Sequence, residues 1–301
     1  MKKWQYGLLA LIALLIALCI FVFVQVRTLE VEQLSDDLFV LRGLGGNTAV
    51  LRTSAGTVVV DTMTLPLQGR RIRELAIELT GADVVLLINT HYHLDHTHGN
   101  PAFEAGTRVL STERTLSHLE TLDADFWTGE AARLLPTETF SDRMTLQVGD
   151  KTMLLIHPGA GHTDGDLVVL FRDEKVLHTG DLMFNRLYPS VDLEAGGSVP
   201  QWVLSLGIML QLDFDRVIPG HGATTDRAGL KQFLTFMTQL ADIGREVANR
   251  EMSLEDTLTT TRLTADEGYQ AIHMIIPLPL DREFVLTRVW EEATGNFQRL
   301  N

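Results

Sequence analysis

Four side chains able to bind a metal ion lie within six consecutive positions of the sequence, at His91, His93, Asp95 and His96. His91 and His93 are two residues apart, so on an extended backbone they point the same way. Asp95 and His96 are adjacent, so they diverge unless the chain turns. This spacing suits two neighbouring metal ions, one for each pair. The alternative is a polar surface turn that is rich in histidine.

The elements that must position these side chains are short apolar runs and a few amphipathic stretches. Runs at 38–42, 48–52 and 57–61, punctuated by glycine, predict an antiparallel meander. The wholly apolar run 84–88 is typical of a strand buried on both faces. Further strands are expected at 108–110, 145–148, 153–156, 167–171, 176–177 and 216–218, and helices at 67–79, 226–250, after Ser253, and at 282–292. This order predicts sheets covered by helices in one domain.

Five of the apolar runs deliver an acid or an imidazole just past their carboxyl ends. The residues reached in this way are Asp61, His91, His162, Asp181 and His221. In open sheets with helical cover, ligands gather in the crevice beyond such strand ends. Glycine stands beside the last three of these positions, where it lets the backbone turn sharply and approach a site closely.

Together these motifs resemble one known family. They are His91-x-His93-x-Asp95-His96, Gly161-His162-Thr163, Gly180-Asp181 and Pro219-Gly220-His221-Gly222, in order between about residues 37 and 225. The sequence is similar to the metallo-β-lactamase-fold superfamily. The resemblance implies an α/β fold, an αβ/βα four-layer sandwich with two metals at one edge of the sheets. The motifs are specific for the fold and not for the substrate.

The resemblance also implies a role for each candidate residue. The first metal would be bound by His91, His93 and His162, the second by Asp95, His96 and His221, with Asp181 bridging both. Asp61 would hold the histidine-rich loop in place without binding metal, and Asp95 would also take part in proton transfer. Such nitrogen and oxygen ligands suit two zinc ions per chain. Diiron relatives often have a carboxylate at the position of His93, so iron is the alternative.

The remaining histidines are expected not to bind metal; they are His98, His118, His157, His178 and His273. Tyr92 alternates away from its histidine neighbours and is also expected not to bind. The segment 182–189, after Asp181, should border the substrate pocket. Phe126 and Trp127 either line that pocket or pack on the edge of the domain.

Composition limits the partners. Asp and Glu number 39 against 25 Lys and Arg, a formal net charge of -14. Nucleic acid is therefore not expected as a partner, because phosphate binding needs a cationic surface. A single cysteine, Cys19, excludes an internal disulfide and a thiolate metal cluster. A small-molecule substrate is expected, and the oligomeric state does not follow from the sequence.

The N-terminal segment predicts a membrane anchor. An apolar run covers residues 7–26, interrupted only by Gln25, which is about the length that spans a bilayer as a helix. Lysines precede the run and acidic residues follow it, so residues 1–6 are expected in the cytoplasm and the rest outside, in the periplasm if the source is bacterial. The alternative is a cleaved signal peptide. Residues 27–36 are expected to be a linker, and 37–301 a catalytic domain with a helical C-terminal part from about 226.

The implied chemistry is hydrolysis. Two zinc ions about 3.5–4 Å apart can share a water and lower its pKa from about 15.7 toward about 7. We therefore expect a hydrolase that uses a metal-bridging hydroxide on an ester, thioester, lactone or amide bond, including a β-lactam. The best-known β-lactamase class carries cysteine where this chain has Asp181, which argues against a lactam. The alternatives are an iron-dependent thiol or persulfide dioxygenase, a phosphodiesterase, and a membrane-tethered binding module without catalysis.

Overall fold

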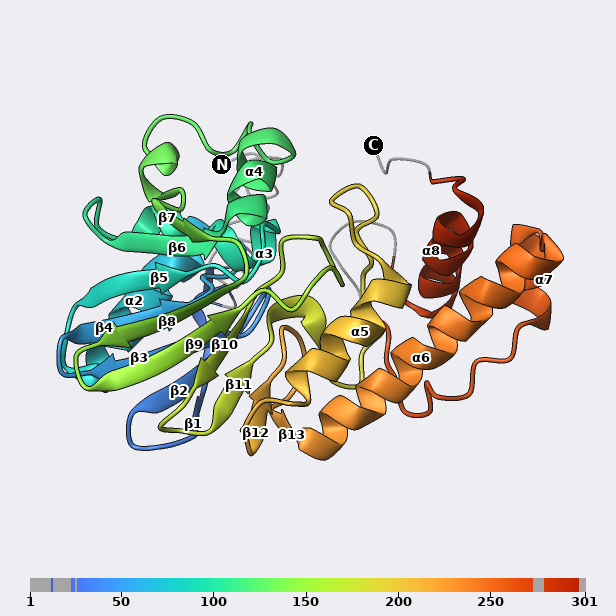
Figure 1. Ribbon diagram of the computed structural model, residues 1–301. Helices are drawn as coiled ribbons and strands as arrows, with labels where there is room; N and C mark the ends of the chain where they lie inside the picture. Colours follow the sequence, from blue (N-terminus) through green and yellow to red (C-terminus); the bar gives the residue numbers. More distant parts are fainter. Residues whose placement is uncertain (1–11, 13–22, 25, 273–278, 298–301) are drawn as a thin grey trace, which may run out of the picture.

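The computed structural model describes residues 12, 23, 24, 26–272 and 279–297. Within them, two β-sheets pack face to face and helices cover both outer surfaces (Figure 1). This is the αβ/βα sandwich that the sequence motifs implied.

In the described part of the chain, the first sheet has seven strands in sequential order. They are β1 Glu30–Gln33, β2 Leu38–Arg42, β3 Thr48–Thr53, β4 Gly56–Val60, β5 Val84–Ile88, β6 Arg108–Thr112 and β7 Glu138–Phe140. The strands β1 to β4 form the predicted antiparallel meander, whereas β4 to β7 run parallel. The parallel half directs the carboxyl ends of β4 and β5 to one edge, where Asp61 and His91 follow.

The second sheet has six strands in the order β13-β12-β11-β10-β9-β8, again counted over the described residues. Their bounds are β8 Arg143–Val148, β9 Lys151–Ile156, β10 Val168–Phe171, β11 Val176–His178, β12 Arg216–Ile218 and β13 Thr225–Asp226. Only β11 and β12 pair in parallel. Their carboxyl ends therefore lie side by side, and they lead to Asp181 and His221.

The helices are shared between the two outer layers. They are α2 Pro66–Thr80, α3 Leu94–Thr97, α4 Glu113–Thr121, α5 Val199–Met209, α6 Arg227–Arg250, α7 Leu254–Thr260 and α8 Arg282–Thr294, with 3-10 turns η1 Asn100–Ala102, η2 Ala131–Leu134 and η3 Gly180–Leu182. In Figure 1, α2 lies behind the first sheet, and α5 and α6 lie beside the second. The orange and red helices α7 and α8 extend this second layer.

Three apolar layers hold these elements together. One lies between the sheets and includes Leu38, Val58 and Phe171. A second fills the space between the first sheet and α2, and the third lies between the second sheet and helices α5, α6 and α8. The predicted apolar stripe of α6 faces this third layer, because Leu230, Phe233 and neighbouring residues recur at helical spacing. The C-terminal helices thus pack on the same core as the second sheet.

Four elements depart from the sequence-based expectation. Residues 27–36, expected as a linker, contain β1, an edge strand whose Glu30 and Glu32 pair with Arg42. Its only apolar residue is Val31, so the alternation that marks a strand is weak, as is common on charged edges. The short strands β7 and β13 and the helix α5 were also not expected. For α5 a start signal is present, because Ser198 caps the helix and a proline follows in its first turn.

The predicted membrane span at 7–26 falls almost wholly outside the described residues. Among the helices that are described, none is both long enough and apolar enough to cross a bilayer.

Candidate metal centre

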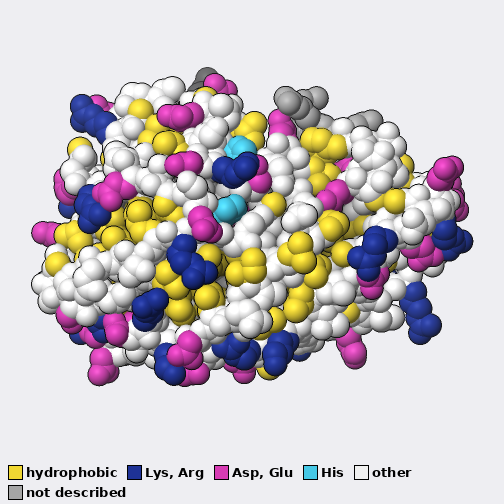
Figure 2. All heavy atoms as spheres, in the orientation of Figure 1, with side chains coloured by type: hydrophobic (Ala, Val, Ile, Leu, Met, Phe, Trp, Pro, Cys, Tyr) yellow, Lys and Arg dark blue, Asp and Glu magenta, His cyan; other side chains and the backbone are white. Residues whose placement is uncertain are grey.

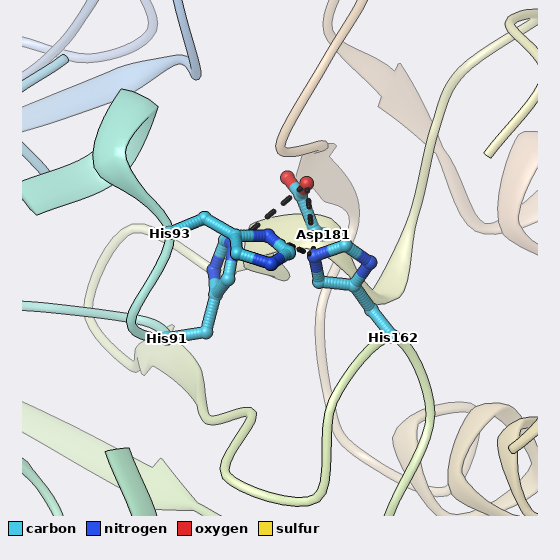
Figure 3. A group of neighbouring side chains, drawn as sticks. All are labelled: His91, His93, His162 and Asp181. Carbon is cyan, nitrogen blue, oxygen red and sulfur yellow. Dashed lines mark hydrogen bonds and ion pairs between the residues drawn. The ribbon is translucent and has the colours of Figure 1, made fainter. Parts of the chain in front are cut away.

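The histidine-rich loop and the ends of the second sheet bring four predicted ligands together. His91, His93, His162 and Asp181 each offer one ligand atom, and these atoms all lie within 4.8 Å of one another. Figure 3 shows the three imidazoles and the carboxylate pointing toward a common centre. The Nε2 atom of His162 lies 2.7 Å from Nδ1 of His93 and 3.5 Å from Oδ2 of Asp181. Three separate loops therefore converge on one small volume.

A second group forms beside the first. It consists of Asp95, His96 and His221, whose ligand atoms also lie within 4.8 Å of one another. Nε2 of His221 is 3.2 Å from Oδ2 of Asp95, and Nε2 of His96 is 3.7 Å from the same oxygen. The two groups have the composition that the sequence motifs implied for two metals.

Asp181 stands between the two groups and turns a different oxygen to each. Oδ2 lies 3.8 Å from Nε2 of His91, on the side of the first group. Oδ1 lies 3.1 Å from Nε2 of His96 and 3.4 Å from Nε2 of His221, on the side of the second. This is the arrangement that a carboxylate needs to bridge two cations.

The turn that the sequence requires between the two pairs is the short helix α3. His93 is the residue before its first turn, and Asp95 and His96 lie within it. The backbone thus passes from the bend after β5, which carries His91, into a helical turn. This change lets adjacent residues face the same centre instead of opposite sides of a strand.

Two glycines allow backbone to pass close to the ligands. A Cβ atom added to Gly220 would lie 2.0 Å from Oδ1 of Asp181, and one added to Gly46 would lie 2.1 Å from the ring of His96. Both distances are far below van der Waals contact. Any larger residue at either position would displace a ligand.

The donor set fits divalent cations. Three of its atoms, Nε2 of His91, Nε2 of His96 and Oδ1 of Asp181, are buried and have no hydrogen-bond partner. Leaving such a group unsatisfied costs about 1–3 kcal/mol. Cations held by these seven residues would satisfy all three atoms at once. Imidazole and carboxylate ligands without thiolate are compatible with zinc and with other divalent metals.

Burial and charge divide the histidines into two kinds. Burial lowers the pKa of His91 well below its ordinary value and that of His162 to about 4. Burial acts in the same direction on His96 and His221, but the charge of Asp181 outweighs it, raising the pKa of His96 well above its ordinary value and that of His221 to about 9. Metals bind neutral imidazole. His91 and His162 are therefore already neutral at neutral pH, whereas His96 and His221 must release protons when they bind a cation. Burial also opposes the charged form of His93, but its hydrogen bond to Asp192 outweighs burial and raises the pKa of His93.

Asp61 and a backbone carbonyl orient the ligands from behind. The carboxylate of Asp61 is fully buried, lies 2.7 Å from Nδ1 of His96, and accepts hydrogen bonds from the backbone N–H and the hydroxyl of Thr90. Nδ1 of His162 lies 2.8 Å from the carbonyl oxygen of Ser190. Such contacts fix the tautomer and the ring orientation of a metal-binding histidine.

Asp192 also orients a ligand of the metal centre, a role that the sequence did not indicate. Its Oδ2 lies 2.9 Å from Nε2 of His93 and accepts a hydrogen bond from the hydroxyl of Tyr92. Its Oδ1 accepts from the backbone N–H groups of Glu194 and Ala195. Burial opposes ionisation, but these donors hold the pKa of the Asp192 carboxyl well below its ordinary range. Asp192 therefore remains charged and holds His93 with Nδ1 directed at the first group.

Replacing Asp192 with asparagine is expected to weaken metal binding at the first group by about 10- to 100-fold, the usual effect of losing such a partner. Tyr92→Phe, which removes one donor to Asp192 but leaves the contact with His93, serves as the matched control and should have a smaller effect. The measurement is zinc affinity by competition with a chromophoric chelator. Equal affinities for the wild type and Asp192→Asn would show that His93 does not depend on this carboxylate.

The other described histidines, which were expected not to bind metal, have hydrogen-bond partners outside the two ligand groups. His98 pairs with Asp123, His118 with Asp164, His157 with the carbonyl of Asp166, and His178 with the carbonyl of Asn47. His273 lies outside the described residues.

Trp127 is buried and donates to Asp123, and Phe126 stacks on the ring of His98 at 3.4 Å between centroids. Both aromatic residues thus pack against the histidine-rich loop. The expected border segment 182–189 contributes Phe184, which stacks on His221.

Comparison with known proteins places this geometry in a family. A sequence model described as the Metallo-beta-lactamase superfamily matches residues 41–221, a range that contains all seven candidate ligands. The chain belongs to the metallo-beta-lactamase superfamily. The matched range ends at His221, so the helices α6, α7 and α8 lie beyond it.

Individual relatives are only distantly similar to this chain in sequence. The 2,4-dinitroanisole O-demethylase subunit alpha of Nocardioides sp. (strain JS1661) is 27% identical over 177 residues, which cover 58% of this chain and 52% of that protein. Metallo-beta-lactamase type 2 of Bacillus sp. (strain 170) is 27% identical over 221 residues, 70% of this chain and 82% of that protein. The chain thus spans about half the length of the first relative and most of the second.

Among solved structures, a metallo-beta-lactamase from Pontibacter korlensis superposes with a TM-score of 0.62 at 22% sequence identity. The match covers 70% of this chain and 99% of that one. This likeness supports the metallo-beta-lactamase fold of the chain and says nothing of its substrate.

Proposed function

We propose that this chain is a hydrolase that uses two zinc ions to cleave an ester, thioester, lactone or amide bond in a small molecule. The observation that carries the proposal is the placement of Asp181. Its two oxygens face two separate groups of ligands, and one of these oxygens is buried without a partner. Zinc ions at the two groups would supply Lewis acidity and an activated water at neutral pH.

The residues of the chain have distinct tasks in this proposal. His91, His96, His162 and Asp181 are buried, His93 and His221 are partly exposed, and all six serve to hold the cations. Asp95 differs, because its side chain is 27% exposed whereas that of Asp181 is 4% exposed. A carboxylate that both contacts the centre and reaches solvent is suited to accept and return a proton during hydrolysis. The proposal therefore assigns proton transfer to Asp95.

The proposed substrates share only the type of bond that is cleaved. The printed names of the relatives suggest two bonds to test, the β-lactam and the aryl methyl ether of 2,4-dinitroanisole. Asp181 stands where the best-known β-lactamase class has cysteine, which makes a β-lactam the weaker candidate. The formal net charge of -14 also disfavours a polyanionic nucleic acid as substrate.

The proposal includes a membrane tether. Residues 7–26 have the length and apolar character of a bilayer-spanning helix, and the charges flanking them favour a cytoplasmic N-terminus. The catalytic part would then lie outside the cytoplasm. Access of a protease to a labelled C-terminus in spheroplasts tests this orientation, and protection of that C-terminus would contradict it.

Metal analysis combined with a substrate panel tests the activity. The full-length chain, purified in detergent, is expected to contain about two zinc ions, the number that the two ligand groups require. It should hydrolyse at least one member of a panel of esters, thioesters, lactones, β-lactams and phosphodiesters, and a chelator should abolish the reaction. A chain holding one iron and oxidising a thiol or persulfide would instead identify the dioxygenase alternative. Two zinc ions with phosphodiester cleavage alone would identify the phosphodiesterase.

A further inference from the structure

Three leucines that are exposed to solvent lie on three different loops around the metal centre. Leu44 is 48% exposed, Leu65 is 40% exposed and Leu94 is 48% exposed. Leu44 lies in the turn between β2 and β3, Leu65 precedes α2, and Leu94 opens α3. We call these three residues the leucine rim. Large apolar side chains held in water are unfavourable, and grouped exposure of this kind marks an interaction surface.

Hydrogen bonds hold the three loops against one another. The carbonyl oxygen of Leu44 accepts from the hydroxyl of Thr64 and from Nε2 of Gln68, on either side of the start of α2. The backbone N–H of Gly46 donates to the carbonyl of Asp95, the residue after Leu94. The leucine rim is therefore one continuous structure and not three independent loops.

The leucine rim borders the metal centre. Leu94 lies between two candidate ligands, His93 and Asp95. Gly46, two residues after Leu44, packs on the ring of His96. Whatever surface covers these leucines will therefore lie beside Asp95, the ligand next to Leu94, whose side chain is 27% exposed.

The end of the predicted membrane span lies against the same region. Arg27 forms an ion pair of 2.5 Å with Glu74 of α2, the helix that follows Leu65. The side chain of Leu29 packs on Gly43, the residue before Leu44, where an added Cβ would lie 2.4 Å from Leu29 Cδ2. The three residue steps from Val26 to Leu29 cover at most about 11 Å even when fully extended. The predicted span and the leucine rim are therefore joined by a very short connection.

The two residues just before this connection are also exposed and apolar. Phe23 is 50% exposed and Val24 is 53% exposed. Both lie within the predicted span 7–26, at the end that leads into this connection. A water-filled gap between a bilayer and the leucine rim would leave the three leucines in water.

We propose that the leucine rim rests on the lipid surface, so that the metal centre opens at the bilayer interface. This inference rests on the membrane tether of the proposed function. The bilayer is the occupant that the structure favours, because the predicted span must enter it within a few residues of the leucine rim. Apolar side chains that rest on a bilayer surface enter about 5–10 Å into the boundary between headgroups and acyl chains. The substrate class that fits is an amphiphile that resides in the membrane.

Fluorescent labels on single cysteines test the contact in the full-length chain. Cys19→Ser removes the native cysteine, and Leu44→Cys, Leu65→Cys and Leu204→Cys each introduce one site for an environment-sensitive label. Leu204, on α5 of the opposite helical layer, is 61% exposed and serves as the matched control. Apolar side chains over α5 can be seen on the face shown in Figure 2. The chains are reconstituted into vesicles of zwitterionic phosphatidylcholine, which does not repel the net negative charge.

Labels at positions 44 and 65 are expected to show blue-shifted emission, loss of quenching by aqueous iodide, and quenching by lipids with a nitroxide in the acyl chain. The label at position 204 should show the reverse. If positions 44 and 65 behave like position 204 in a chain that floats with the vesicles, the leucine rim does not touch lipid although the tether is intact. A chain that does not float with the vesicles would overturn the tether and this inference together. Zinc content and hydrolysis of a water-soluble ester in detergent, measured on the same preparations, report on the metal chemistry independently.

Discussion

Replacing Asp181 with asparagine is expected to lower kcat/KM by about 1,000-fold or more and to reduce the zinc content below two ions per chain. Asparagine keeps the shape of the side chain but loses its charge, and it replaces one acceptor oxygen by an amide donor. It therefore cannot present an anionic oxygen to each ligand group, as Asp181 does. Metal ions supply several kcal/mol of charge stabilisation, and a loss of about 4 kcal/mol corresponds to about 1,000-fold in rate. Activity with the best panel substrate and metal content by mass spectrometry provide the measurement.

Asp213→Asn is the matched control for this experiment. Its side chain is 83% exposed and lies 3.5 Å from Lys175, so the substitution removes only a surface ion pair. Such pairs contribute about 0–1 kcal/mol, and the control should keep both zinc ions and full activity. An Asp181→Asn variant that also kept both would refute the bridging role of Asp181.

Asp61→Ala is expected to destabilise the metal-free protein by about 3 kcal/mol or more, whereas Asp61→Asn should cost only about 1–2 kcal/mol. Alanine leaves the two donors of Thr90 and Nδ1 of His96 without an acceptor. Asp61 also adopts a φ of 63°, which asparagine tolerates better than alanine. Asparagine retains an acceptor for Thr90 but no longer presents a carboxylate to His96. The zinc affinity of the Asp61→Asn variant should therefore fall by about 10- to 100-fold.

Urea denaturation and zinc competition on the same samples separate the two effects. Lys175→Ala is a control for the backbone contribution, because Lys175 also has a positive φ, of 51°, but its side chain is half-exposed. It should cost about 1 kcal/mol, the usual range for such a backbone conformation. If Asp61→Asn bound zinc as tightly as the wild type, the carboxylate would have no role in orienting His96.

Much of the candidate centre could be predicted because its determinants are local. The apolar runs at 84–88 and 216–218 match β5 and β12 residue for residue, and each leads directly to a ligand. A ligand that follows a strand end is positioned by that strand, and parallel strands bring their carboxyl ends to one edge. The resemblance to the superfamily implied how the ligands divide, and in the structure the same residues lie in two groups.

Other features of the centre and the fold could not be predicted because they depend on contacts between segments that are distant in the sequence. Asp192 is 99 residues from His93 in the sequence, and no periodicity or motif marks it as a partner. His162 is oriented by the backbone carbonyl oxygen of Ser190. Every residue type has such an oxygen, so the sequence does not mark this contact. The strand β1 has too few apolar residues to be recognised, and it forms because β2 offers an open edge.

The sequence by itself therefore determined which side chains could bind metal and which strands carry them, and its resemblance to the superfamily implied how they divide into two groups. Residue type sets ligand chemistry, and short-range spacing sets the strands and turns. Only the tertiary structure decided that the two oxygens of Asp181 face different groups, that Asp192 holds His93, and that the leucine rim lies beside the end of the predicted membrane span. These features depend on the relative positions of loops from both sheets, and packing of the whole chain sets those positions.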